Sequence, residues 1–199
     1  MKKILFTLAT LLLATSLFAQ EFDAHFNDGT LRIDYTFMGN AQEQYIGLSE
    51  MSYTDGWYGR RTNLNNVPLK GNGDLTIKDY ETGEVIYMTS FSSLFQEWIT
   101  TPEALTITKS FEFTLLVPMP KRATIAEMVL RDNTGEESKL AHTIDPKDVL
   151  IRNRYNQKAV PHCYTHQGGD SKECIDIVIL AEGYRIDELD TFYEDAMIT

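Results

Sequence analysis

The stretch "LRIDYTF", Leu31–Phe37, decides the fold class of this chain, because apolar and polar side chains alternate along it. A repeat of two residues is typical of a β-strand that buries one face and exposes the other. The apolar face carries Leu31, Ile33, Tyr35 and Phe37. The stretch therefore predicts a half-buried strand.

Similar runs continue on the C-terminal side of this stretch. They are "DLTIKDY" (74–80), "EVIYMTS" (84–90), "FEFTLLVP" (111–118), "TIAEMVLRD" (124–132) and "DVLIRN" (148–153). Glycine turns separate several of them, as in "ETGE" and "DNTGEE", and "SSLFQEW" (92–98) has the spacing of a short helical crossover. Many short strands with turns between them indicate an antiparallel sandwich or barrel. We expect a mainly β protein, with a jelly-roll-like antiparallel sandwich over residues 20–153.

The composition changes after the last run. Residues 154–173, "RYNQKAVPHCYTHQGGDSKE", have few aliphatic side chains and no sustained period, so they predict a linker or an ordered loop between two units. "IDIVILA" (175–181) is almost continuously aliphatic, as expected for a strand covered on both faces. A helical stripe follows it, at Ile186, Leu189, Phe192, Tyr193 and Ala196. We expect residues 174–199 to form the first strand and helix of an α/β domain that continues beyond Thr199.

The N-terminus and the net charge bear on where the protein works. Residues 1–19 combine two lysines, an apolar run of about a dozen residues and small residues near Ala19, which is the pattern of a secretory signal peptide. We expect export to the periplasm, the cell surface or the medium, with no membrane span after cleavage. Loss of Lys2 and Lys3 would change the formal net charge from -11 to -13. Such an acidic protein is a poor partner for nucleic acid, which is bound by clustered Lys and Arg.

Several blocks of the chain resemble one known family. The blocks are "LRIDYTFMGN", "GRR" (59–61), "GNGD" (71–74), "SFSSLFQEW", "KSFEFTLLVPMPK" and the closing "IDIVILAEGY" and "FYEDA". Together they are similar to the N-terminal half of the secreted IgA-protease-like zinc metallopeptidases. The resemblance implies a β-sandwich domain followed by an α/β catalytic domain with a zinc-binding His-Glu-x-x-His helix. It also implies that the parent polypeptide hydrolyses peptide bonds in proteins, with its own catalytic domain as the partner of the sandwich and protein as the substrate.

The zinc motif itself is missing from these residues. Zinc hydrolysis needs two imidazoles one helical turn apart, a third ligand and a carboxylate that accepts a proton from the bound water. None of the four histidines begins a His-Glu-x-x-His sequence. We therefore assign no catalytic, cofactor-binding or metal residue here, expect this chain to be inactive alone, and expect zinc in the missing catalytic domain. Arg60 and Arg61 are candidate contacts across the domain boundary.

The segment "HCYTH" (162–166) and the two cysteines leave alternatives open. In an oxidising compartment Cys163 and Cys174, which are close in sequence, are a candidate disulfide. His162, His166 and a cysteine would instead suit zinc, but Pro161 before the segment and two glycines after it argue against the helix that would align the imidazoles. A plain loop is the third interpretation.

A second function, from another class, is compatible with the same residues. The chain could be a free-standing exported sandwich that binds a glycan or a protein through Trp57, Tyr58 and Trp98. In a sandwich such aromatics are more often core or interdomain packing, which favours the accessory domain of a zinc endopeptidase.

Overall fold

The computed structural model describes residues 22–67, 69–154, 162–170 and 174–198. The chain divides into two compact units, residues 1–156 and 157–199. The predicted signal peptide (1–19) lies outside the described residues, as does part of the predicted linker (154–173). The domain boundaries drawn from the sequence stay predictions.

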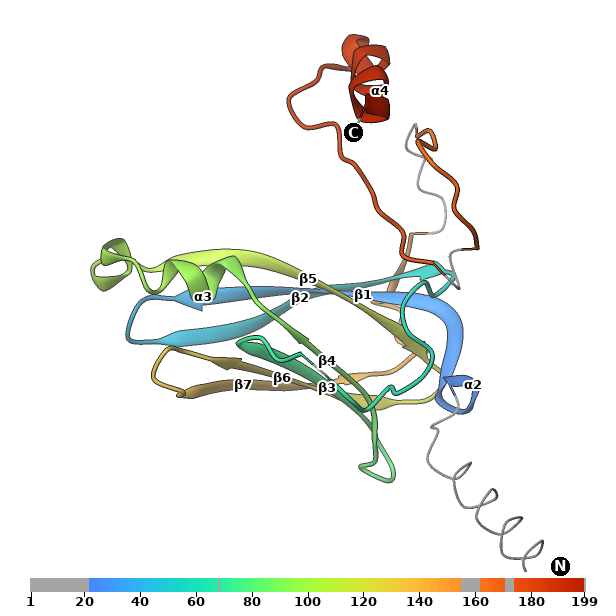
Figure 1. Cartoon of the computed structure of the whole chain (residues 1–199). Helices are drawn as coiled ribbons and strands as arrows, with labels where there is room; N and C mark the ends of the chain where they lie inside the picture. The colour runs from blue at the N-terminus through green and yellow to red at the C-terminus, as the bar shows by residue number, and fades with distance from the viewer. Residues whose placement is uncertain (1–21, 68, 155–161, 171–173, 199) are drawn as a thin grey trace, which may run out of the picture. The chain divides into compact units, whose positions relative to one another are not determined.

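Two four-stranded sheets form the first unit, and Figure 1 shows them as two layers. The first sheet has the order β5-β1-β2-β8, with β1 at Phe26–Gly39, β2 at Gln44–Asp55, β5 at Lys109–Pro120 and β8 at Arg152–Asn153. The second has the order β4-β3-β6-β7, with β3 at Gly73–Asp79, β4 at Val85–Phe91, β6 at Thr124–Arg131 and β7 at Glu137–Ile144. Short helices complete the unit: α2 (Phe22–His25), α3 (Leu94–Trp98) and the 3-10 helix η2 (Pro102–Leu105).

The core lies between the two sheets. All four apolar residues of "LRIDYTF" are at most 1% exposed, as the alternation predicts. The facing sheet contributes the fully buried Leu75, Ile77, Ala126, Met128 and Leu130. Burial of one large aliphatic or aromatic side chain contributes about 1.5–3 kcal/mol, so this double layer stabilises the sandwich. The mainly β sandwich is confirmed, whereas its description as jelly-roll-like stays a prediction.

The strand pattern differs from the prediction in three places. β2 has no regular alternation because a register shift beside Asp34 and Tyr35 inserts an extra residue in it. β7 was not predicted because His142 occupies a position between Leu140 and Ile144 where an apolar residue would reveal the pattern. The run 148–153 is mostly turn, and its last two residues form β8, which pairs with β2 in parallel. The predicted antiparallel pairing holds for the other strand pairs described and is wrong at this strand.

Local chemistry explains the predicted turns and the crossover. Asp79 accepts hydrogen bonds from the backbone N–H groups of Glu81 and Thr82, at 3.0 and 2.9 Å, and closes the "ETGE" turn. Gly83 in that turn has a φ of 71°, which favours glycine. The predicted crossover helix is confirmed as α3, whose N-cap is Ser93.

The second unit contains the 3-10 helix η3 (Ile186–Glu188) and helix α4 (Leu189–Ile198). The Glu188 carboxylate accepts a hydrogen bond from the Arg185 N–H at 2.9 Å, which caps the helix start without a Ser or Thr. The predicted helix is confirmed. The predicted strand 175–181 is not formed: among the described residues it has no strand partner, and Ile175, Ile177 and Leu180 are 92%, 85% and 79% exposed. A strand needs a neighbour for its backbone groups, and this unit supplies none within its described part.

Candidate functional site

The loop after β2 is held to the sandwich by Arg60. Its guanidinium donates hydrogen bonds to the carbonyl oxygens of Asn66, Leu64 and Met88, and it lies 5.2 Å from the centre of the Tyr87 ring. The Arg60 carbonyl in turn accepts the indole N–H of Trp57 at 3.0 Å. Arg60 therefore joins the loop to β4 inside the first unit.

Arg61 lies on the outside of the same loop. Its guanidinium forms an ion pair with Asp28 at 2.5 Å, donates to the Trp57 carbonyl at 3.1 Å and covers the Phe22 ring at 4.6 Å. The Arg61 side chain is still 40% exposed. Both arginines thus bind atoms of their own unit, and their role at a domain boundary stays a prediction, with Arg61 the more accessible of the two.

The predicted aromatic surface is divided by burial. Trp57 is 7% exposed and packs edge-on against Tyr87. Trp98 packs on Phe111 with ring centres 5.5 Å apart, and its indole N–H donates to Glu103 at 2.7 Å. Tyr58 alone of the three predicted aromatics is fully accessible, at 89%. The two tryptophans are therefore packing residues.

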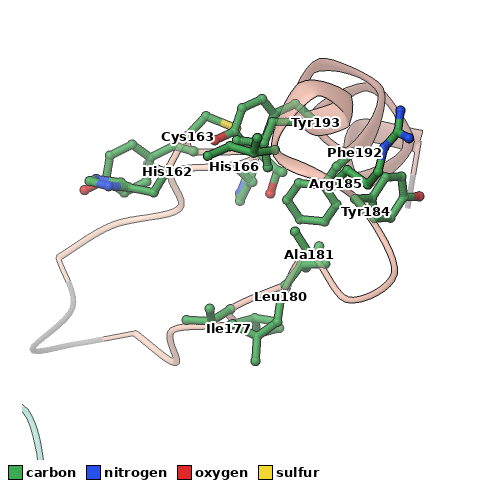
Figure 2. Close-up of a pocket in the computed structure, with 17 residues that line it drawn as sticks. His162, Cys163, His166, Ile177, Leu180, Ala181, Tyr184, Arg185, Phe192 and Tyr193 are labelled. Atoms are coloured by element: carbon green, nitrogen blue, oxygen red, sulfur yellow. The ribbon is translucent and has the colours of Figure 1, made fainter. Parts of the chain in front are cut away.

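A hollow of about 500 Å³ dominates the second unit, and Figure 2 shows its three walls. One wall is the segment 162–166, the second is the extended segment 177–181, and the third is the apolar side of η3 and α4. Tyr184 packs on Phe192 at 5.3 Å and donates to Asp195 at 2.8 Å, which holds the helix against the preceding loop. The predicted stripe of α4 thus faces a space that these segments do not fill.

The cysteines and histidines of the second unit are open to solvent. Cys163 and Cys174 are exposed, unpaired thiols in this structure, and their pairing stays a prediction. Residues 162–166 are not helical, so His162 and His166 do not share a helix face. Within the ranges that the structure describes, no three His, Cys, Asp or Glu side chains are placed to hold a metal ion. Nor does any helix there have the length and apolarity to cross a bilayer.

Two polar contacts were not predicted from the sequence because their partners are far apart in the chain. The Tyr35 hydroxyl on β1 lies 2.8 Å from His142 Nε2 on β7, so the contact joins the two sheets. Burial raises the pKa of Tyr35 and lowers the pKa of His142.

The second contact is centred on Glu50. Its carboxylate pairs with Arg152 at 3.3 Å and also with Arg154, whose backbone N–H donates to the Tyr53 carbonyl at 2.8 Å. Residue 154, predicted as linker, is therefore attached to the sandwich.

Comparison with known families adds the decisive observation. The family described as the N-terminus of peptidase M64 matches residues 21–141, which include the strands from β1 to β6 and most of β7. The chain belongs to the peptidase M64 family. M64 is the IgA-specific zinc metallopeptidase family, so the family resemblance of the sandwich is confirmed. The M64 match does not reach residues 142–199, so the resemblance of that part stays a prediction. Comparison with curated proteins finds no match for this M64 chain.

Proposed function

We propose that this chain supplies the N-terminal accessory domain of a secreted zinc metalloendopeptidase that acts on proteins, as an IgA peptidase does. The observation that carries the proposal is the M64 N-terminal match over residues 21–141, which covers the folded sandwich except for the end of β7 and β8. In this proposal the sandwich supports the catalytic domain or positions protein substrate. The chain by itself does not cleave peptide bonds.

The second unit is proposed as the start of the α/β catalytic domain. Its extended segment 175–181 carries aliphatic side chains on both faces, and most of them are exposed. Exposed apolar surface of this kind is covered in stable proteins by further elements. Strands and helices of the remaining catalytic domain are the proposed cover, and zinc would be bound there by residues outside this chain.

The Glu50 contacts support the idea that the sandwich orients the start of the connection to the catalytic domain. Arg152 and Arg154 lie where the chain leaves the first unit, and both pair with the same carboxylate on β2. Because β8 also pairs with β2, the start of the connection has a defined direction relative to the sandwich. A domain that supports another one needs its connecting segment to leave in a fixed direction, as residues 152–154 do here.

The glycan-binding alternative loses two of its three aromatic residues. Trp57 is buried and Trp98 packs half-buried against Phe111, which leaves Tyr58 as the exposed ring among the three. A single ring is a weak platform for a sugar, so we favour the peptidase accessory domain.

Two measurements test the proposal. The 3′ sequence of the gene should contain an open reading frame that continues into His-Glu-x-x-His, and a stop codon directly after Thr199 would contradict it. The purified chain, incubated with zinc and either casein or immunoglobulin A, should leave both substrates intact. Chelator-sensitive cleavage by the chain alone would contradict the assigned accessory role.

A further inference from the structure

We infer that the outer edge of β5 binds an extended peptide whose side chains run apolar, basic, apolar. The inference deepens the proposed function, on which it rests for one point only: that the peptide is a segment of the protein substrate. Four observations carry it, namely the unpaired edge, the alternating side chains of β5, an adjacent aromatic hollow and a free carboxylate.

The edge of β5 lacks a second neighbour. In the order β5-β1-β2-β8, β5 pairs with β1 on one side, and no further strand pairs with it in the described part of the chain. Exposed edges are usually protected by lysine, proline or a bulge. Here Pro118 and Pro120 protect the C-terminal end, and Lys109 at the other end is paired with Glu103 at 2.6 Å. Residues 110–117, "SFEFTLLV", contain no lysine and no proline. Half of their backbone N–H and C=O groups therefore face outward without such protection.

The side chains of β5 alternate at this edge. Phe111 and Phe113 point toward the sandwich interior, where they pack against other rings, yet both are only half-buried. Glu112 and Thr114 lie on the opposite face and are exposed. A peptide strand added beside β5 has the same alternation. Its residues next to Phe111 and Phe113 would enter the interior side, and the residue between them would lie beside Glu112.

An aromatic hollow is open beside these phenylalanines. It measures about 190 Å³ and is lined mainly by Phe37, Leu94, Phe95, Phe111 and Phe113. Leu94, on α3, lies at the rim of this hollow and is 71% exposed. Helix α3 itself contacts β5 (Figure 1). The hollow is suited to a leucine or phenylalanine side chain. Such pockets for alternate side chains give specificity when a peptide extends a sheet.

The charge of Glu112 indicates which residue type the bound peptide has between its two apolar residues. Glu112 borders both the aromatic hollow and a polar hollow of about 310 Å³ on the outer face of the sheet. The other charged groups that line the polar hollow already have partners: Arg32 pairs with Asp34 at 2.9 Å, and Glu50 pairs with Arg152 and Arg154. Glu112 has no ion pair within the described residues. A lysine or arginine of the peptide would supply the missing cation. A second copy of this chain fits less well, because its own β5 would bring another Glu112 and no free cation.

The experiment uses the purified chain and three fluorescein-labelled peptides. The first is Ser-Thr-Phe-Lys-Phe-Thr-Ser, the second has Glu in place of Lys, and the third is the first with alternate backbone nitrogens methylated. Fluorescence anisotropy should give about fivefold tighter binding of the Lys peptide than of the Glu peptide, the size expected for one partly exposed charge pair. The methylated peptide should not bind, because strand pairing needs its N–H groups.

Two variants make the result specific to β5. Glu112→Lys should reverse the preference between the Lys and Glu peptides, whereas Glu136→Lys, at an exposed position in the turn before β7, should leave it unchanged. Circular dichroism checks that both variants stay folded. Equal binding of all three peptides, no binding up to about 1 mM, or dimerisation through β5 in sedimentation would each overturn the inference. These outcomes would leave the proposed function standing, since that depends on the reading frame and on proteolysis.

Discussion

Replacement of Arg60 by alanine should destabilise the sandwich far more than replacement of its neighbour Arg61. The Arg60 guanidinium donates to three backbone carbonyls and covers the Tyr87 ring. Arg61 makes a largely exposed ion pair with Asp28 and covers Phe22. The two variants remove the same charge from adjacent positions, so each is the matched control of the other.

The expected magnitudes follow from these contacts. A hydrogen bond to a charged donor contributes about 1.5–3 kcal/mol, and Leu64, one of the three acceptor residues, is fully buried. Because water can reach part of this site after truncation, we expect a loss of about 2–4 kcal/mol for Arg60→Ala. An exposed ion pair contributes about 0–1 kcal/mol, so Arg61→Ala should cost at most about 1 kcal/mol. Arg60→Lys should fall between them, because a single ammonium nitrogen would replace the two guanidinium nitrogens, Nη1 and Nη2, that share the three carbonyls.

Urea unfolding measures the difference. Tryptophan fluorescence, measured in a Trp98→Phe background so that Trp57 is the emitter, reports on the loop because the Trp57 indole donates to the Arg60 carbonyl, and circular dichroism reports on the sheets. Coincidence of the two transitions would establish two-state unfolding. Thermal midpoints should fall by about 4–16 °C for Arg60→Ala and by less than about 4 °C for Arg61→Ala. Equal losses of unfolding free energy in Arg60→Ala and Arg61→Ala would refute this reasoning. Arg60 would then be a better candidate for a contact with another domain.

Three further perturbations test other parts of the structure. The backbone N–H of Thr82 is the main cause of the lowered pKa of Asp79. A carboxylate with a depressed folded-state pKa stabilises above its unfolded pKa and loses that stabilisation as pH falls through the folded value, so the stability difference between wild type and Asp79→Ala should shrink below about pH 4. Glu50→Gln should release residues 152–154 and accelerate tryptic cleavage there, and an unchanged cleavage rate would contradict the proposed fixed exit. Dialysed protein should contain no stoichiometric zinc by metal analysis, and zinc that is lost in His162→Ala would reverse the preference against a metal site.

The sequence predicted most of the sandwich because its inner residues obey a simple period. Leu31 to Phe37 alternate, and all four apolar positions are buried. β2 escaped prediction because a bulge breaks its alternation, and β7 because its inner face includes His142. The pattern identifies a strand only where packing is apolar and regular.

The candidate site was less predictable, because its members meet through tertiary structure. The "GRR" motif marked Arg60 as notable, yet only the fold placed its guanidinium on the carbonyls of Leu64 and Met88. Glu112 gave no signal in sequence, since its importance comes from the unpaired edge and from the hollow beside it. Contacts of this kind join residues that are far apart in the sequence, so local periodicity does not reveal them.

By itself the sequence determined the fold class, the apolar faces, the turns at glycine and the family resemblance. These depend on side-chain type and on spacing along the chain. Tertiary structure alone decided which strands became edges, which charges were neutralised and which aromatics were buried. The segment 175–181 marks the limit between the two: its residues favour a strand, but a strand forms only when neighbouring strands accept and donate its backbone hydrogen bonds.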